Sequence, residues 1–355
     1  MNKERVLPMR RKIPCIFLAG LLVCVAVGCT PLSFSTAQKQ EASFTDLFDT
    51  SSTVTVYGVG EADFAGQIAA LKEELTAYHQ LCDIYHPYDG VTNLYDLNRA
   101  GGKALVLDDR LLDVLEYGQK AYDETLGRVN ICMGAVLSLW HTCRENAGEH
   151  PETAALPDQA ALDEAMAHTD IRALVIDREA HTARLTDKSV TVDVGAIAKG
   201  YAVERAARFA REELGWTSAV LNIGGNIRVI GQKGDGGFRI GVQNPDTASA
   251  KAYIAKVTVS DRSVVTSGDY QRFFTVDGVR YAHIIDPATG YPAAYCKAVT
   301  VICADSGRAD MLSTALFATP LEDALAWADS LDGVEAIFVA QDGREWRTAG
   351  FADYE

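Results

Sequence analysis

The sequence predicts an α+β fold with a mixed or antiparallel sheet and flanking helices. Residues 64–81 and 111–126 carry apolar side chains at helical spacing, which indicates amphipathic helices in the first half of the chain. Short β-branched segments separated by glycine turns dominate the second half, as is typical of antiparallel hairpins. The chain is long enough for one large domain or for two lobes.

The first 28 residues read as a signal peptide. Five basic residues precede an apolar run, residues 13–27, which is too short to span a membrane. The run ends in Ala26-Val27-Gly28-Cys29, which resembles the lipobox of bacterial lipoproteins. The resemblance implies cleavage before Cys29 and a lipid such as palmitate on its sulfur; ordinary secretory cleavage is the alternative. Residues 29–45 read as a polar tether, and residues 46–355 form the predicted domain.

The charge balance argues against one class of partner. Without residues 1–28, the chain keeps 28 Lys and Arg against 47 Asp and Glu, so its net charge falls from −15 to −19. A general nucleic-acid binder needs a basic face, and we expect no nucleic-acid partner. A small ligand that carries phosphate is still compatible, because a metal ion and helix N-termini supply local positive potential.

Several common cofactor motifs are missing from the sequence. It has no CxxC and no HExxH, and the cysteines are scattered, which indicates neither a zinc ribbon nor a disulfide framework. It also lacks GxxxxGK[ST] and a strict GxGxxG. A nucleotide would therefore be held by something other than a P-loop or a standard Rossmann turn.

In the first half, a strand at 52–57 precedes the helix at 64–81, and Gly127 closes the helix at 111–126. Tyr88 and Asn98 on the intervening loop could stack on and hydrogen-bond a planar heterocycle, although a core role for the tyrosine is favoured. The remaining assignments are strand and loop at 128–140, loop at 143–156, helix at 158–168 and a hairpin from 172–176 and 182–185.

Residues 190–202, VTVDVGAIAKGYA, predict a strand ending at Asp193-Val194 and a helix from about Ala196 to Leu214. The first turn of a helix offers free N–H groups and the positive end of the dipole, which favour an anion. Lys199 lies in that turn, where a cation is disfavoured unless it meets a phosphate. A solvated lysine on an exposed helix face is the alternative.

The second half contains the remaining candidate residues. Its predicted strands are 221–231 with a turn at Gly224-Gly225, 238–244, 253–260, 263–267, a hairpin at 273–285, and 298–303. The turn in residues 281–292 is expected to present His283 and Asp286 at a rim, where a histidine could act as a general acid or base. A surface hairpin with an incidental histidine is the alternative.

A helix that follows residue 304 places Asp310, Ser313 and Thr314 on one face, at i, i+3 and i+4. One carboxylate with hydroxyls is an all-oxygen set that suits Mg²⁺. The alternative is a helix-start aspartate and a threonine that bonds back to the backbone.

Four segments together resemble one family. DVGAIAKGYA at 193–202, NIGGN at 222–226, HIIDPATG at 283–290 and ADMLSTA at 309–315 occur in the order seen in the ApbE-type FAD:protein FMN transferases. The resemblance runs from about Phe48 to the C-terminus and implies two lobes with an FAD cleft between them. It also implies a Mg²⁺-dependent enzyme that moves FMN from FAD onto a Thr hydroxyl of a target membrane redox protein and releases AMP.

The resemblance also implies roles for individual residues. His283 would accept the proton of the target threonine. Asp310, Thr314 and the carbonyl of Ala196 would bind Mg²⁺, with Ser313 nearby. Contacts with FAD would come from Tyr88, Ala135, Val136, Leu137, Asp193, Lys199 and Ile284. With the signal peptide, it places a lipid-anchored protein on the extracytoplasmic face of the cell membrane.

Two other functions remain open at this stage. A Mg²⁺-dependent FAD pyrophosphatase would use water in place of the threonine and release FMN and AMP. A non-catalytic FAD-binding lipoprotein would need no metal-binding face, and therefore no Asp310.

Overall fold

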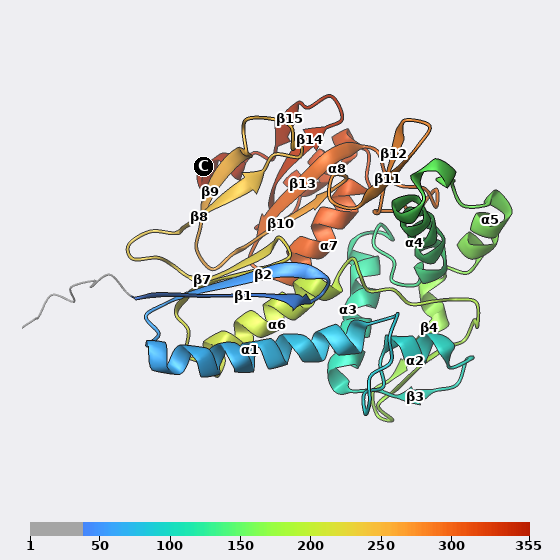
Figure 1. Cartoon of the computed structure of the whole chain (residues 1–355), viewed down its shortest axis with the longest axis horizontal. Helices are drawn as coiled ribbons and strands as arrows, with labels where there is room; N and C mark the ends of the chain where they lie inside the picture. Colours follow the sequence, from blue (N-terminus) through green and yellow to red (C-terminus); the bar gives the residue numbers. More distant parts are fainter. Residues whose placement is uncertain (1–37) are drawn as a thin grey trace, which may run out of the picture. The chain divides into compact units, whose positions relative to one another are not determined.

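A computed structural model describes residues 38–355 and is built around one large antiparallel sheet. Eight strands follow one another in the order β1-β2-β6-β7-β10-β13-β14-β15 (Figure 1). Their bounds are β1 Lys39–Leu47, β2 Thr50–Tyr57, β6 Ser218–Ile223, β7 Asn226–Gly231, β10 Ser263–Gly268, β13 Cys296–Cys303, β14 Glu335–Ala340 and β15 Glu345–Arg347. Every neighbouring pair is antiparallel.

Smaller sheets stand beside this one. Strands β8 (Phe238–Gln243) and β9 (Tyr253–Val259) form a hairpin, as do β11 (Phe273–Val276) and β12 (Val279–Ala282). A third sheet has the order β3-β5-β4, with β3 Leu105–Val106, β4 Leu174–Asp177 and β5 Thr182–Leu185. The β11-β12 hairpin leads directly into His283.

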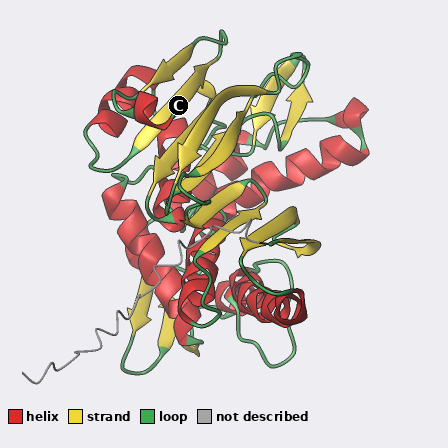
Figure 2. Ribbon diagram, turned by 90° about the vertical axis from the view of Figure 1, so that its left-hand side faces the viewer, coloured by secondary structure: helices red, strands yellow, loops and turns green. Residues whose placement is uncertain are grey.

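Some of the helices lie on one face of the large sheet, and the others lie beside it. Their bounds are α1 Glu61–Cys82, α2 Leu94–Arg99, α3 Asp109–Glu124, α4 Gly134–Glu149, α5 Gln159–Ala167, α6 Ala198–Glu212, α7 Ser306–Phe317 and α8 Leu321–Asp329. Of these, α6 packs on β7 and α7 packs on β10 and β13. Figure 2 shows the same helices and strands from the side. The opposite face is covered by the β8-β9 hairpin, whose Ile240 and Val257 join Val229 and Ile302 in a second core.

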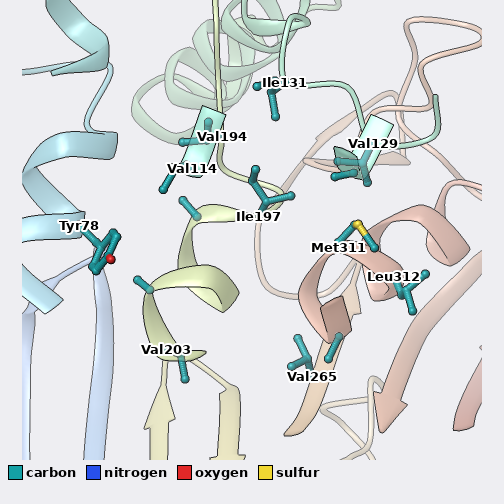
Figure 3. Packing of buried hydrophobic residues seen from close by; sticks show 14 of the residues in the cluster. Tyr78, Val114, Val129, Ile131, Val194, Ile197, Val203, Val265, Met311 and Leu312 are labelled. Carbon is teal, nitrogen blue, oxygen red and sulfur yellow. The ribbon is translucent and has the colours of Figure 1, made fainter. Parts of the chain in front are cut away.

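The main core lies between the helices and the sheet. Tyr78 of α1, Val203 of α6 and Leu312 of α7 are buried in it together with Val265 of β10 (Figure 3). Helix α1 buries the stripe that its sequence predicts: Leu71, Leu75, Tyr78 and Leu81 recur every three or four residues. Burial of these side chains, each contributing about 1.5 to 3 kcal/mol, holds the helices on the sheet.

The predicted fold class is confirmed: the chain is α+β, with antiparallel sheets and flanking helices. Residues 38–355 belong to one compact unit. The division into two lobes with an FAD cleft stays a prediction. Within residues 38–355, no helix is both long and apolar enough to cross a membrane. Cys29 and the signal peptide lie outside the described residues.

Three sequence-based assignments are corrected by the structure. Residues 128–140 were expected to be strand and loop, but helix α4 begins at Gly134. The loop expected at 143–156 also begins later, because α4 continues to Glu149. Its apolar side chains pack on α5 and on the β11-β12 hairpin, which makes this apolar run a buried helix. The strand expected to end at Asp193-Val194 is an extended loop, in which Asp193 N–H donates to the Ile131 carbonyl at 2.8 Å.

The third correction concerns the tether. Strand β1 begins at Lys39, inside the predicted tether 29–45, so the sheet starts earlier than residue 46. Its side chains alternate between exposed and half-buried positions, because β1 is the edge strand and pairs only with β2. Because an edge strand carries many polar side chains, this segment was assigned to the tether. Phe48 and Asp49, with φ of 54° and 51°, form the turn into β2.

Candidate active site

The site is built where α6 and α7 meet. Asp305 caps α7, because its side chain accepts a hydrogen bond from the Arg308 amide at 2.8 Å. One turn later, Asp310 is buried, and its Oδ2 accepts a hydrogen bond from the Gly200 amide of α6 at 2.8 Å. A side chain at Gly200 would place its Cβ 2.5 Å from the Ser306 carbonyl and would also meet Asp310. The two helices can approach this closely only because residue 200 is glycine.

The Asp310 carboxylate lies in an environment that disfavours its negative charge. Burial raises the pKa of Asp310, and Lys199, the Gly200 amide and Asn226 oppose that rise. The Asn226 Nδ2 is buried and makes no hydrogen bond of normal geometry, so we assign it only an electrostatic effect on Asp310. A cation next to Asp310 would relieve the cost of burying this carboxylate.

Hydroxyl groups lie one turn further along α7. Thr314 is partly exposed, and its Oγ1 lies 3.3 Å from the Oγ of Ser267 on β10. Ser313 is fully buried, with its Oγ 2.8 Å from the same Ser267 oxygen and 3.0 Å from the Asp310 carbonyl. Asp310 and Thr314 therefore lie one turn apart on the same face of α7. The Ser313 hydroxyl already forms hydrogen bonds with Ser267 and with the Asp310 carbonyl. Ser267 belongs to a strand that the sequence predicted, but no local signal marked it.

The carbonyl of Ala196 is a third oxygen that could hold a metal. Ala196 lies two residues before the start of α6, and the Gly200 amide, four residues on, donates to Asp310 instead of to Ala196. The turn and loop hydrogen bonds of residues 38–355 include no donor to this carbonyl. A carboxylate, a hydroxyl and a carbonyl form the kind of oxygen set that Mg²⁺ takes alongside water and phosphate ligands.

No group of three or more His, Cys, Asp or Glu side chains that could hold a metal occurs within residues 38–355. The candidate magnesium ligands therefore include a single carboxylate, that of Asp310. Such a sparse set of protein ligands fits a cation that depends on substrate phosphates for much of its coordination.

Lys199 lies in the first turn of α6, as predicted, and its Nζ donates to the Gly224 carbonyl at 3.3 Å. Gly224 has φ of 56°, and Thr50 fills the space where a side chain would be. The charge of Lys199 lowers the pKa of both Asp310 and His283. The charge of Lys199 therefore acts on both a candidate metal ligand and the candidate base.

The backbone around His283 selects its tautomer. Both the backbone amide and the ring Nδ1 of His283 approach the Arg272 carbonyl, at 3.1 and 3.2 Å. A carbonyl only accepts, so Nδ1 carries the proton and Nε2 has the free lone pair. Burial of the ring, then Arg272 and Arg144, lowers the pKa of His283 to about 4. The imidazole is therefore neutral near pH 7, in the form that accepts a proton.

Asp286 was expected at the rim with His283, but the structure shows it buried. Its Oδ2 accepts from the Tyr295 hydroxyl at 2.8 Å, and its Oδ1 accepts from Arg128 at 3.2 Å. The turn folds back on itself, with the Asp286 amide donating to the Tyr291 carbonyl at 2.8 Å, which draws the carboxylate inward. Asp286 therefore anchors the turn that carries His283. Neighbouring Ile284 is buried in the main core, and its carbonyl accepts from Ala293.

Ala135, Val136 and Leu137 lie in the first turn of α4. Gly134 precedes them and packs against the Thr191 carbonyl, which a Cβ would meet at 2.6 Å. The N-cap residue, Met133, provides no side-chain hydrogen bond, and the amides of a first helical turn have no partner within the helix. The Gly134 amide donates to the Thr191 carbonyl and the Leu137 amide to the Met133 carbonyl, so the amides of Ala135 and Val136 are the ones in this turn that could hydrogen-bond an anion or a polar ligand atom.

The loop that carries Asp193 is held in place by Asn98. The Asn98 side chain both donates to and accepts from the Val192 backbone, each at 2.8 Å. Its amide is thus used inside the protein and is not available to a heterocycle. Asp193 accepts from the Gly195 amide at 2.8 Å, and burial raises its pKa, with Gly195 and His141 opposing the rise.

Two tyrosines of the neighbouring loop have different surroundings. Tyr88 donates to Asp83 at 2.8 Å and packs edge-on against His79, so its ring supports the loop. Tyr85 is 52% exposed, its ring lies 5.2 Å from that of His141, and the Asp193 charge acts on its hydroxyl. Tyr85 is the better placed of the two to stack on a planar ligand beside Asp193. Both lie in one predicted loop, and nothing local in the sequence distinguishes them.

Comparison with known proteins gives a consistent result. The model of the ApbE family matches residues 48–338. A relative from Treponema pallidum, described as FAD:protein FMN transferase, is 34% identical over 96% of both chains. A Klebsiella pneumoniae protein with the same description is 31% identical, over 70% of this chain and 75% of its own.

Solved structures agree in fold. The ApbE protein of Thermotoga maritima superposes with a TM-score of 0.78 at 27% identity, covering 90% of this chain and 99% of its own. The flavin transferase ApbE of Vibrio cholerae gives 0.74 at 25% identity, over 90% of this chain and all of its own.

Proposed function

This chain belongs to the ApbE family and is a transferase, and from that premise we propose that it moves FMN from FAD onto a threonine hydroxyl of a target protein, releases AMP and requires Mg²⁺. The observation that carries the proposal is the contact between Gly200 and Asp310. It brings the Asp310 carboxylate, which shares a face of α7 with Thr314, against the first turn of α6, just after Ala196, and the charge of Lys199 acts on both Asp310 and His283.

Several residues are assigned to binding the dinucleotide. Asp310, Thr314 and the Ala196 carbonyl would hold Mg²⁺, with Ser313 supporting them through Ser267. The metal, when bound, supplies positive charge that neutralises the diphosphate and polarises its phosphorus. Lys199 and the first-turn amides of α4 supply further positive potential.

His283 is assigned the proton transfer. A threonine hydroxyl is a weak nucleophile and needs a base within hydrogen-bond reach. The neutral Nε2 of His283 takes the hydroxyl proton as the threonine oxygen bonds to the phosphorus of the FMN moiety. The bond from that phosphorus to the AMP oxygen breaks, and AMP leaves with the bonding electrons. Asp286 keeps the turn that carries His283 in position.

The proposal is tested with purified protein, FAD, Mg²⁺ and an acceptor domain from a membrane redox complex. We expect covalent flavin on an acceptor threonine and an equal amount of AMP, and neither when EDTA is present. Release of AMP at the same rate without the acceptor would identify the protein as an FAD pyrophosphatase. Tight FAD binding with no AMP under any condition would identify a binding lipoprotein.

We also propose that the protein works on the extracytoplasmic face of the cell membrane, anchored by a lipid on Cys29. The support is the sequence of residues 1–29, in which small residues precede the cysteine at the end of an apolar run. Cell fractionation and mass spectrometry test this: the natural chain should sediment with membranes as a cleaved chain that begins at a lipid-modified Cys29, and Cys29→Ser should carry no lipid. A natural chain that sediments with membranes without a lipid on Cys29 would contradict the lipid anchor.

A further inference from the structure

Trp140 connects helix α4 to the turn that carries His283. Its indole Nε1 donates to the Gly290 carbonyl at 2.7 Å, and the two residues are 150 positions apart in the chain. Among the hydrogen bonds of residues 38–355, this is the only one that the Gly290 carbonyl accepts. The tryptophan side chain is 2% exposed, so loss of the indole donor would leave a carbonyl in a poorly hydrated place. The turn therefore depends on this indole for its attachment to α4.

The ring of Trp140 also packs on residues to either side of His283 in the sequence. Tyr281, two residues before the histidine, stacks on the indole with ring centroids 6.0 Å apart. Ile285, two residues after it, belongs to the same buried cluster as Trp140. Further along the turn, Tyr291 meets the indole edge-on at 5.4 Å. The chain therefore enters and leaves His283 through segments that pack on one side chain.

The same helix begins with the turn that is expected to contact FAD. Val136 lies one turn before Trp140 on α4 and belongs to the same cluster. This first turn has an anchor of its own, because the Gly134 amide donates to the Thr191 carbonyl at 2.8 Å. Loss of the indole donor should therefore loosen the turn that carries the histidine and leave the start of α4 in place. The length of α4 between these two points fixes how far apart they lie.

We propose that Trp140 is a positioning residue that holds His283 at a fixed distance from the flavin nucleotide bound at the first turn of α4. This inference rests on the proposed function and adds to it the side chain that places the base. A base must lie about 2.6 to 3.2 Å from the hydroxyl that it deprotonates. A displacement of about 1 Å, even one caused far from the reacting atoms, can lower a rate about 100-fold.

The test compares Trp140→Phe with a matched control, Trp216→Phe. Phenylalanine keeps an aromatic ring in the core but has no indole N–H. Trp216 is 1% exposed, and its Nε1 donates to Gln67 of α1 at 2.6 Å, in the main core. Each variant loses one indole hydrogen bond, so both should unfold at a lower denaturant concentration than the natural chain. Only Trp140 is bonded to the turn that carries His283.

Titration with FAD gives the affinity and the number of binding sites in each protein. Transfer is then measured with Mg²⁺, saturating FAD and a saturating acceptor domain, and is expressed per binding site. Trp140→Phe should transfer about 10- to 100-fold more slowly per site, with an FAD affinity within about threefold of the natural value. Trp216→Phe should keep its rate per site within about twofold. A purely structural role for Trp140 would lower the number of sites and leave the rate per site unchanged.

Gly290→Ala tests the same contact from its other side if Trp140→Phe does not fold. Gly290 has φ of 74°, and a Cβ there would lie 2.9 Å from the sulfur of Met166. The backbone of residue 290 must shift to accept it, which moves the carbonyl away from the indole. We expect the same result as for Trp140→Phe, a slower transfer per site with FAD affinity nearly unchanged.

Three results would overturn this role of Trp140. The first is a rate per site within about twofold of the natural chain, for Trp140→Phe or for Gly290→Ala in its place. The second is a loss of rate per site in Trp216→Phe as large as that in Trp140→Phe. The third is an FAD affinity that falls as much as the rate, which would assign Trp140 to the support of the ligand site. A natural chain that neither binds FAD nor transfers FMN would instead refute the proposed function.

Discussion

The amide of Gly200 donates a 2.8 Å hydrogen bond to the carboxylate of Asp310, and this contact joins α6 to α7 at the centre of the site. It places the only carboxylate among the candidate magnesium ligands beside the first turn of α6, which carries Lys199. Several predictions depend on this contact and on the residues that surround it.

Gly200→Ala should destabilise the protein and abolish transfer. The new Cβ would lie 2.5 Å from the Ser306 carbonyl and would displace Asp310, so we expect a loss of about 1 to 3 kcal/mol in the free energy of unfolding. Denaturant unfolding and a transfer assay measure both effects. The control is Gly66→Ala, in the middle of α1 with open space around it, which should be neutral or stabilising by up to about 1 kcal/mol. Equal stability of the two variants would contradict the close packing of α6 on α7.

Asp286→Ala should destabilise the turn that carries His283. The substitution leaves Arg128 and the Tyr295 hydroxyl without their buried acceptor, which should cost about 2 to 3 kcal/mol. Asp277→Asn, in the exposed tip of the neighbouring β11-β12 hairpin, should cost almost nothing, since asparagine also tolerates its φ of 49°. Chemical denaturation distinguishes the two. A catalytic role for Asp286 would instead appear as lost transfer with unchanged stability.

Tyr85 and Tyr88 should respond differently to substitution. Tyr85→Ala removes an exposed ring beside Asp193 and should weaken flavin binding about three- to tenfold, whereas Tyr85→Phe should not. Tyr88→Phe loses the hydrogen bond to Asp83, which should lower stability by about 1 kcal/mol and leave flavin affinity unchanged. Quenching of flavin fluorescence reports affinity in each variant. The reverse pattern would move the stacking contact to Tyr88.

The lowered pKa of His283 predicts a pH dependence of stability. Its value of about 4 lies below the usual 6.5, so acidification protonates this histidine in the unfolded chain first. The contribution of His283 to stability is therefore complete above pH 6.5 and is lost as the pH falls toward 4. His283→Gln should flatten this part of the melting-temperature profile, whereas His150→Gln, at an exposed position, should not. Parallel profiles for all three proteins would refute the neutral, shielded histidine.

Regular local patterns made much of this fold predictable. The apolar spacing of α1 and α3 and the glycine turns of β6-β7 and β11-β12 led to assignments that the structure confirms within a few residues. Helix α4 was missed because its apolar residues, which pack on α5 and on the distant strand β11, form a run that locally resembles a strand. Strand β1 was missed because an edge strand needs few apolar residues.

Local sequence patterns also predicted part of the candidate site. Asp310 and Thr314 share a helix face, which spacing alone reveals, and the structure brings them together. The burial of Asp286 depends on Arg128, which is 158 residues away, and Ser267 reaches the site from another strand. Such partners leave no mark in local sequence, and only the folded chain identifies them.

The most direct test of the magnesium-centred transferase compares the natural chain with Asp310→Ala in one mass-spectrometric assay of acceptor, FAD and Mg²⁺. The natural chain should attach FMN to an acceptor threonine and release an equal amount of AMP. The Asp310→Ala variant should still bind FAD but attach no FMN to the acceptor, because the buried carboxylate that accepts from the Gly200 amide is gone. Transfer by Asp310→Ala at a rate near that of the natural chain would contradict the proposed mechanism.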